Sequence, residues 1–517
     1  MRTIKALVIA AITVTILIFV ARFVYPLPSF EGRKPSQALP ISINTTMGNA
    51  ILNEMADHVG KSGMIPLLSG EDAFAARILL AEAAVESLDV QYYIWQNDLT
   101  GFLLLDALRK AAERGVRVRL LLDDNGTPFL DQELLALNES PNFEVRYFNP
   151  FVLRKPRTLS LLFDFPRLNR RMHNKSFTVD GAVTIVGGRN IGDIYFNSNE
   201  DVNYFDFDVL AAGLAATDVA NDFDGYWASG SAYPADSLIT KKADGLALLA
   251  ANVEKFRALP RAAEYRTALG KTSFLADVMG TSGRAEWVTM TLVSDDPLKG
   301  LGPVASDQLM IVRLAQIIGE VKSSFDLVSA YFVPGDQFTK ILTGYARNGV
   351  NVRTVTNSQE STDVVTVHSG YVKYRDELLA AGIEVFEMAA NPADIGPKDR
   401  LGILGSSSSS LHAKTFAIDR DRIFVGSFNF DPRSANLNSE MGFLVESPRM
   451  AAAMSDAIGQ IGQNGSYQAV LTPSGAIEWI EQQPDGSTRR HPKEPNTTVL
   501  SRLYVRMLGW LPIMWML

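Results

Sequence analysis

The sequence contains no cysteine among its 517 residues. This absence excludes disulfide bonds, thiolate metal sites, a cysteine nucleophile and a lipoprotein cysteine anchor. Histidine is also scarce, so any imidazole chemistry must come from five side chains. They are His58, His173, His368, His412 and His491.

A strong excess of charge of one sign is missing as well. The formal net charge is −8, from 49 Lys and Arg against 57 Asp and Glu, which argues against a protein whose whole surface binds nucleic acid or anionic lipid. Local basic patches remain compatible with it. With 47% apolar and 21% charged residues, the chain has the composition of a globular protein of about two to four domains.

One long apolar run is present, at the N-terminus. Residues 6–21 are uncharged and mostly apolar, slightly short of the roughly 20 residues that cross a hydrocarbon core. If Arg22 extends its guanidinium to the interface, the next three residues lengthen the run until Pro26 ends the helix. No small-x-small cleavage site follows, so an uncleaved anchor over residues 1–25 is favoured over a cleaved signal peptide. Basic residues flank both ends, which leaves the side of the membrane open.

The chain contains an internal duplication. The segment LDVQYYIW leads through a helical pattern to VRVRLLLDDN, and FDLVSAYFVPG leads in the same order to VNVRTVTNS. Gly115 and Gly349 lie at the ends of these helical patterns, where a C-cap favours a residue in the left-handed conformation. The sequence offset between the two glycines is nearly the same as that between His173 and His412. Repeated strand-helix-strand units predict an α/β fold of two duplicated α/β/α halves packed face to face around one site.

The predicted division of the chain has six parts. They are a membrane segment (1–25), a linker (26–64), a first half (65–234), a helical connector (235–285), a second half (286–470) and a C-terminal tail (471–517). The tail ends in the apolar segment 499–517, which contains two tryptophans. Two interpretations of it stay open, a segment lying in the lipid headgroup zone and a segment packed against the protein's own core.

Each half carries one copy of an H-x-K-x4-D motif. The candidate catalytic residues are His173, Lys175 and Asp180 in the first copy and His412, Lys414 and Asp419 in the second. Matched G-x-x-N loops follow, and they supply Asn190, Ser427 and Asn429 as candidate phosphate-binding or supporting residues. A single such motif is a weak signal, whereas two copies with matched loops are a strong one.

The spacing within the motif predicts an anion site. Histidine and lysine two residues apart on a strand leave the same face, and hairpin turns at Asp180 and Asp419 bring the second strand back beside the first. Asp180 and Asp419 are therefore favoured as turn or hydrogen-bonding residues rather than proton carriers. When the halves face each other, two imidazoles, two ammonium groups and neutral donors converge, which suits a phosphate.

Two histidines can carry out a two-step transfer. One attacks phosphorus to form a phosphohistidine, while the other protonates the leaving alkoxide and then activates the incoming hydroxyl. The paired lysines neutralise the phosphate oxygens, so we expect no metal ion and no cofactor. Each imidazole also needs a carboxylate to fix its tautomer, and Asp206 and Glu440 are the candidates because each follows its loop and precedes an apolar strand pattern.

These motifs resemble the phospholipase D superfamily. The stretches YYIWQNDLTG, GGRNIGDIYF and FNFDPRSANLNSEMGFLVES resemble bacterial cardiolipin synthases, most closely the class C type, over roughly residues 65–470. The resemblance implies that His173 is the nucleophile and His412 the acid/base. It also implies that Glu440 orients His173 and Asp206 orients His412, across the two halves. The copies differ where Gly188 replaces Ser427 and Asp206 replaces Glu440.

The substrate class follows from other features. The N-terminal anchor and the mixed basic and apolar segment 151–171 favour phospholipid over nucleic acid, although that segment is also compatible with a surface loop with a buried apolar centre. The resemblance implies a phosphatidyltransferase of the bacterial inner membrane that makes cardiolipin from phosphatidylglycerol, with phosphatidylethanolamine as a second candidate donor. The alternatives are a phospholipase D-type phosphodiester hydrolase and a noncatalytic lipid-binding protein. Whether an accessory protein takes part stays open.

Overall fold

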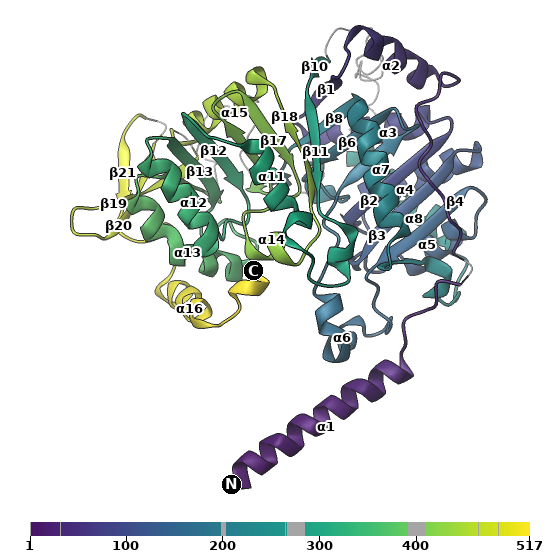
Figure 1. The fold of residues 1–517 in the computed structure, drawn as a ribbon, viewed down its shortest axis with the longest axis horizontal. Coiled ribbons are helices and arrows are strands. Elements are labelled where there is room, and N and C mark those ends of the chain that lie inside the picture. Colours follow the sequence, from purple (N-terminus) through teal and green to yellow (C-terminus); the bar gives the residue numbers. More distant parts are fainter. Residues whose placement is uncertain are drawn as a thin grey trace.

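A computed structural model describes residues 2–31, 33–197, 203–263, 265, 285–390, 409–463, 465–483 and 485–517. Two large sheets stand side by side, each flanked by helices (Figure 1). The predicted α/β class is confirmed.

The first sheet has nine strands in the order β10-β1-β8-β6-β5-β2-β3-β4-β9. Their bounds are β1 Ser62–Leu67, β2 Ser87–Ile94, β3 Arg117–Gly126, β4 Phe143–Phe148, β5 Ser176–Val179, β6 Val183–Gly187, β8 Asp208–Gly213, β9 Ala232–Pro234 and β10 Glu286–Val288. The flanking helices are α3 Gly70–Ala83, α4 Leu99–Glu113, α5 Asp131–Asn138, α7 Leu214–Ala228 and α8 Gly245–Arg257. The central strands β2, β3 and β4 run parallel, and α4 and α5 connect them.

The second sheet has ten strands in the order β11-β18-β17-β16-β12-β13-β14-β19-β20-β21. Their bounds are β11 Met290–Ser294, β12 Ser324–Ser329, β13 Asn351–Asn357, β14 Glu384–Met388, β16 Lys414–Ile418, β17 Arg422–Gly426, β18 Met441–Val445, β19 Ser466–Leu471, β20 Ile477–Gln482 and β21 Thr488–His491. Its helices are α11 Met310–Ile318, α12 Gly335–Arg347, α13 Val365–Ala380, α14 Pro432–Asn436 and α15 Pro448–Ile461. From β11 to β19 the order repeats that of the first sheet from β1 to β9, which confirms the duplication.

The glycines that marked the repeat have the conformation predicted for them. Gly115 has a φ of 98° and Gly349 a φ of 87°, each just after the helix that precedes the second parallel strand. A residue with a side chain is strained in this left-handed region, so glycine lets both chains turn sharply into β3 and β13.

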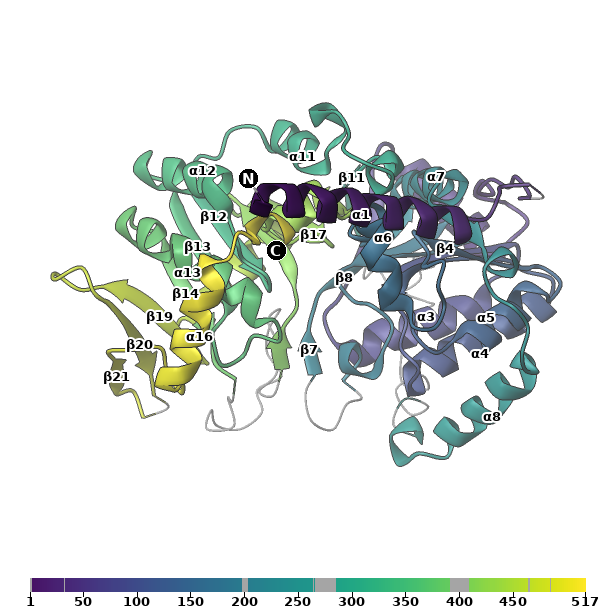
Figure 2. The same ribbon diagram turned by 90° about the horizontal axis from the view of Figure 1, so that it is seen from below.

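The halves pack against each other through an apolar core. Val186 of β6, Val209 of β8, Val425 of β17 and Phe443 of β18 belong to one buried cluster, and each half has a further core of its own. A short two-stranded sheet also joins the halves, because β7 (Asn203–Phe205) pairs in parallel with β15 (Ser409–Leu411) (Figure 2). The halves therefore face each other across a shared core.

The observed elements cross several of the predicted boundaries. The predicted linker 26–64 contains α2 (Thr46–Asp57) and the start of β1, and β10, from the predicted second half 286–470, pairs with β1 of the first sheet. The predicted tail 471–517 contributes β20 and β21 to the second sheet. An edge strand can accept any neighbouring strand with a matching register, which a sequence division does not reveal. Residues 264 and 266–284 of the predicted connector 235–285 lie outside the described residues.

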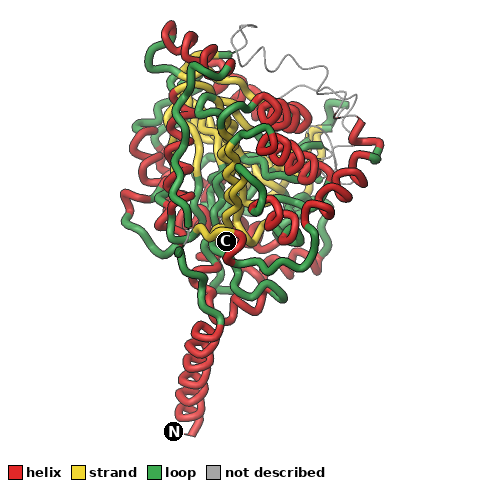
Figure 3. The backbone as a smooth tube through the Cα atoms, turned by 90° about the vertical axis from the view of Figure 1, so that its right-hand side faces the viewer, coloured by secondary structure: helices red, strands yellow, loops and turns green. Residues whose placement is uncertain are grey.

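The N-terminal helix α1 (Arg2–Val24) extends away from the body (Figures 1 and 3). Residues Thr3–Val24 are long and apolar enough to cross a membrane, which agrees with the predicted anchor over residues 1–25. At its base, Arg22 Nε donates a hydrogen bond of 2.7 Å to the carbonyl of Phe163 in α6 (Leu161–Leu168). The helix is thereby joined to the first half.

The C-terminal segment packs against the body along one side only. Helix α16 (Val499–Trp510) lies against α13, and the chain ends in η7 (Met514–Met516), where Trp515 packs edge-on against Phe165 of α6. The residues of the segment that remain exposed are mostly large and apolar. The large apolar ones are Val499, Leu500, Leu503, Tyr504, Met507, Trp510, Leu511 and Trp515. Part of this segment thus contacts the protein, and part faces outward.

Candidate active site

Each histidine is held by the backbone of the opposite half. The amide of His173 donates a hydrogen bond of 2.8 Å to the carbonyl of Ser439, and the amide of His412 donates one of 2.8 Å to the carbonyl of Phe205. The two bonds are related by the duplication, because each acceptor residue directly precedes a buried carboxylate. This arrangement brings both histidine motifs to the junction of the halves.

The carboxylates lie across that junction, as the resemblance implies. His173 Nδ1 is 2.7 Å from Glu440 Oε2, and His412 Nδ1 is 2.5 Å from Asp206 Oδ2. Glu440 and Asp206 are fully buried, whereas His173 and His412 keep 6% and 5% of their surface exposed. A carboxylate on Nδ1 fixes the tautomer and directs Nε2 of each ring to the chemistry.

The motif lysines lie beside the histidines and are buried. Lys175 Nζ donates a hydrogen bond of 2.7 Å to the carbonyl of His173, and Lys414 Nζ donates one to the carbonyl of His412. Lys414 Nζ also lies 3.1 Å from Nδ1 and 3.4 Å from Nε2 of His412. Burial lowers the pKa of Lys175 to about 7 and also lowers the pKa of Lys414. A bound phosphate would favour the charged form of both groups.

The electrostatics of the two half-sites differ. Burial, with the charges of both lysines, holds the pKa of His173 well below its usual value, and burial raises the pKa of Glu440 to about 7. Burial and Lys414 lower the pKa of His412, but Asp206 opposes that shift. Burial acts to raise the pKa of Asp206, but Lys414 and His412 outweigh burial and lower it. A neutral imidazole suits a nucleophile, whereas an imidazole beside an ionised carboxylate suits a proton carrier.

Ser427 and Gly188 occupy equivalent positions but differ in their role. The Ser427 hydroxyl donates a hydrogen bond of 2.5 Å to Oε2 of Glu440, the same oxygen that faces His173. At Gly188, a Cβ atom would lie 2.1 Å from Oδ1 of Asp206. The serine therefore positions Glu440 instead of pointing at a phosphate, and the glycine makes room for the shorter Asp206.

The two asparagines also differ. Asn190 Oδ1 accepts a hydrogen bond of 3.1 Å from the amide of Ile94, and its Nδ2 donates one of 3.1 Å to the hydroxyl of Tyr195. Both ends of Asn190 are therefore used within the protein, which makes it a supporting residue. Asn429 Oδ1 is buried and has no hydrogen-bond partner among the described residues.

Asp180 and Asp419 lie at the far ends of β5 and β16 from the histidines. Asp180 accepts hydrogen bonds from the amides of residues 85–87, and Asp419 accepts them from the amides of residues 322–324. Each also occupies a tight turn with a positive φ. They have the turn and hydrogen-bonding role that the spacing favours, and neither contacts a motif histidine among the described residues.

Four of the six basic residues of segment 151–171 pair with the protein's own carboxylates, namely Arg154, Arg157, Arg167 and Arg171. Arg154 forms ion pairs with Asp124 and Asp131, and Arg157 lies 2.7 Å from Asp131. Asp124 lies in β3 and Asp131 at the start of α5, and both are distant in sequence, so composition did not reveal them. The large apolar residues of the segment that are exposed are Leu159, Leu162 and Phe165.

Sequence reasoning missed the tyrosines around the histidines. Tyr93 lies edge-on to His173 with ring centroids 5.0 Å apart, and Tyr331 lies edge-on to His412 at 6.4 Å. Tyr93 lies near the end of β2 and Tyr331 just after β12, the equivalent strands of the repeat, which is a signal that comparison of the two copies could have found. Tyr204 stacks on His412 at 5.0 Å, and Tyr195 lies edge-on to it at 5.2 Å.

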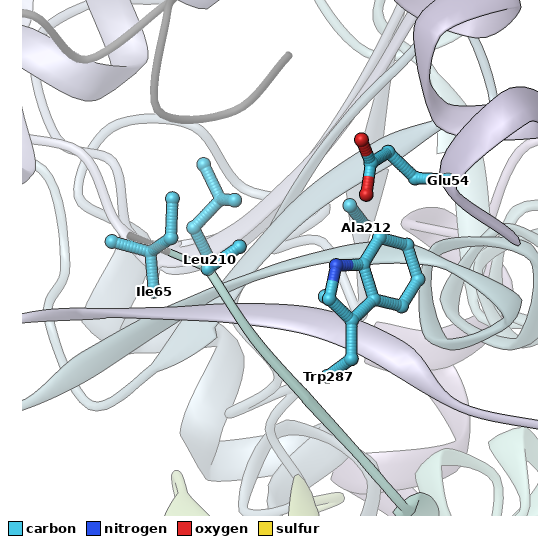
Figure 4. A pocket seen from close by; sticks show the side chains of 7 residues that line it. Glu54, Ile65, Leu210, Ala212 and Trp287 are labelled. Atoms are coloured by element: carbon cyan, nitrogen blue, oxygen red, sulfur yellow. The ribbon is translucent and has the colours of Figure 1, made fainter. Parts of the chain in front are cut away.

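A small cavity lies elsewhere, beside α2 and the edge of the first sheet (Figure 4). It has a volume of about 10 Å³ and is lined by Glu54, Gly63, Ile65, Leu210, Ala212, Ala285 and Trp287. A space of that size holds a single water molecule at most, and it shares no residue with the histidine cluster. The chemistry therefore belongs to the junction of the halves.

Comparison with known proteins agrees with this site. The family model described as cardiolipin synthase, phospholipase D-like domain, matches residues 78–227 and 314–461, which contain both histidine motifs. The chain is 42% identical to cardiolipin synthase C of Escherichia coli, over 91% of this chain and 99% of that protein. It is 25% identical to a cardiolipin synthase of Listeria welshimeri, over 75% of this chain and 67% of that protein.

A solved structure shares the fold. The crystal structure of the phosphatidylserine synthase of Haemophilus influenzae matches with a TM-score of 0.56 and 14% sequence identity. The match covers 89% of this chain and 96% of that one. At this identity the likeness concerns the fold alone.

Proposed function

The chain belongs to the family of cardiolipin synthases with phospholipase D-like domains, and we propose that it transfers a phosphatidyl group onto the glycerol hydroxyl of phosphatidylglycerol through a phosphohistidine. The observation that carries this proposal is the crossed pair of imidazoles, each with its Nδ1 on a carboxylate of the opposite half. Phosphatidylglycerol or phosphatidylethanolamine serves as the donor.

In the first step, Nε2 of His173 attacks the phosphorus of the donor. A P–N bond forms while the P–O bond to the donor headgroup breaks, and His412 gives its Nε2 proton to the departing oxygen. The low pKa of His173 favours the neutral ring that this attack requires. Lys175 and Lys414 lie beside the histidines and balance the charge of the phosphate oxygens.

In the second step, the acceptor hydroxyl gives its proton to Nε2 of His412, and its oxygen attacks the phosphorus. The P–N bond breaks, His173 returns to its neutral form, and the phosphodiester of cardiolipin is complete. Asp206 stabilises the positive charge that His412 carries before the first step and regains in the second. Water in place of the acceptor would give the hydrolase reaction instead.

The membrane position of the enzyme follows from three segments that lie together. Helix α1 contacts α6 through Arg22, and α6 contacts the C-terminal turn through Trp515. Figure 1 shows α6 and α16 at the end of the body from which α1 departs. We place α1 across the inner membrane and the exposed apolar residues of α6 and α16 in its interface.

Product identification tests the function. Purified full-length protein is incubated with acyl-labelled phosphatidylglycerol, with and without phosphatidylethanolamine, and the lipids are separated. Labelled cardiolipin supports the proposal, and extra cardiolipin in the mixed sample identifies phosphatidylethanolamine as a donor. Phosphatidic acid as the sole product would favour the hydrolase and contradict the proposal.

A further inference from the structure

The surroundings of the two histidines differ in charge. On the side of His173, the hydroxyl of Tyr93 accepts a hydrogen bond of 3.3 Å from Asn125 Nδ2, and the charges of Asp123, Arg171 and Arg433 act on that hydroxyl. Asp123 is itself paired, because it accepts hydrogen bonds from the amides of Asn125 and Met172 and lies 3.3 Å from Arg171. Amide and cationic donors therefore border this half of the site. Such donors suit the oxygens of a phosphate.

On the side of His412, a carboxylate takes the place of these donors. The hydroxyls of Tyr204 and Tyr331 donate hydrogen bonds of 3.0 and 2.7 Å to the same oxygen, Oδ2 of Asp363. Tyr204 comes from the first half and Tyr331 from the second, and both rings pack against His412. Asp363 is therefore held at the hydroxyl ends of the two rings that pack on the imidazole we propose as the proton carrier.

Asp363 keeps its capacity to accept further hydrogen bonds. It is exposed and precedes α13. Its charge acts on Lys414, but within the part of the chain that the structure describes it forms no ion pair. Its second oxygen, Oδ1, has no partner among the same residues. The transfer between phosphorus and the two imidazoles makes no use of this carboxylate.

We infer that Tyr204, Tyr331 and Asp363 bind the headgroup of the alcohol that leaves or arrives at His412, through hydrogen-bond donors on that headgroup. This inference rests on the proposed function, in which His412 meets the alcohol oxygen. The rest of the alcohol must then lie against the rings that pack on His412. A carboxylate there accepts hydrogen bonds from a neighbouring hydroxyl or an ammonium group and repels a second anion.

Soluble alcohols test this site in the full-length enzyme with phosphatidylglycerol as the donor. Glycerol has a hydroxyl next to the reacting one, whereas 1-propanol has the same carbon chain without it. In Asp363→Asn, we expect the ratio of transfer to glycerol over transfer to 1-propanol to fall about tenfold, the loss expected for one hydrogen bond to a charged group. Ethanolamine, the headgroup of phosphatidylethanolamine, is the third acceptor. If Asp363 binds its ammonium group, Asp363→Asn should lower transfer to ethanolamine more than transfer to glycerol, because a charged donor makes the stronger hydrogen bond to the carboxylate.

Asp421→Asn is the matched control. It removes the same charge from the same half, but it lies in the turn after β16, at the end of that strand away from His412. Its glycerol to 1-propanol ratio should equal that of the unmodified enzyme. If Asp363→Asn lowers transfer to all three alcohols equally, Asp363 only braces the two tyrosines, and the inference is wrong while the transferase proposal stands. No transfer by the unmodified enzyme to any alcohol would contradict both.

Discussion

The carboxylate of Asp206 occupies the space that a side chain at Gly188 would need, with a Cβ atom there only 2.1 Å from Oδ1 of Asp206. In the second half, the longer Glu440 leaves room for Ser427 and accepts a hydrogen bond from its hydroxyl. The two differences between the sequence copies are thus one coupled change. Each half-site pairs its carboxylate with a neighbour of matching size.

This coupling predicts an asymmetric response to substitution. Gly188→Ala should displace Asp206 from His412 and lower kcat by about a hundredfold or more, because a misoriented general base loses most of its rate. Ser427→Ala removes one hydrogen bond to Glu440 and should cost only about tenfold. Steady-state kinetics in mixed micelles measures both, and circular dichroism checks that the variants are folded. Equal losses would contradict the proposed fit.

The raised pKa of Glu440 predicts a pH dependence. With this pKa at about 7, kcat/KM should fall as the pH drops below 7, because a protonated Glu440 no longer stabilises charge on His173. Glu440→Gln should be slower and should lose that acid limb. Rate measurements across pH 5 to about 9 test it. An unchanged acid limb in the variant would assign it to another group.

The same group predicts a trend in stability. Between its ordinary pKa of 4.5 and the folded value of about 7, the folded state binds a proton that the unfolded state has released. The free energy of unfolding should therefore fall as the pH rises through this window. Glu440→Gln lacks this contribution, so the unmodified protein should lose stability relative to the variant as the pH rises. Denaturant unfolding at several pH values measures the difference.

Metal independence is a further prediction, since buried lysines lie where a metal site would place carboxylates. EDTA should leave the rate largely unchanged in detergent, where metal effects on lipid packing are small. A loss of activity that Mg²⁺ or Ca²⁺ restores would overturn the proposed role of Lys175 and Lys414.

The membrane segments can be separated from the catalytic site. Deletion of residues 1–25 should release the catalytic body from stable membrane attachment. It should lower activity on liposomes far more than activity in micelles. Residual binding should remain, because each buried methylene of the C-terminal segment contributes about 0.8 kcal/mol. Trp510→Ser with Trp515→Ser in the deleted form should weaken that residual binding. Liposome co-sedimentation measures it.

Val59→Ser is the control for these tryptophans. Val59 is 85% exposed and lies just after α2 in the chain. Helix α2 lies at the opposite end of the body from α16 (Figure 1). It should not change liposome binding. Equal losses of activity in micelles and liposomes on deletion would mean that the N-terminal segment supports the fold instead of the membrane position.

Local patterns in the sequence were sufficient to predict the framework of the site. Two-residue spacing placed His173 beside Lys175 and His412 beside Lys414, and the glycines after each helix marked the repeat. These features depend on neighbouring residues and on regular strand geometry, which a sequence displays directly. The turn role of Asp180 could be predicted for the same reason.

Contacts between distant segments could not be predicted in this way. Asp363 meets Tyr204 across the junction of the halves, and Arg154 meets Asp124 through the fold of the first half. The strands β20 and β21 joined the second sheet because its edge was available to them. Each of these depends on three-dimensional packing, which composition and periodicity do not encode.

Trapping of the covalent intermediate tests the central claim most directly. Enzyme mixed with phosphatidylglycerol labelled in its acyl chains is denatured rapidly without exposure to strong acid, and protein-bound label is counted. The account predicts bound label in the unmodified enzyme and none in His173→Ala. In His412→Ala, label should form more slowly, because the leaving oxygen lacks its proton donor, and should persist once it has formed. Label retained in His173→Ala and lost in His412→Ala would reverse the two roles, and turnover without bound label in any form would contradict the phosphohistidine.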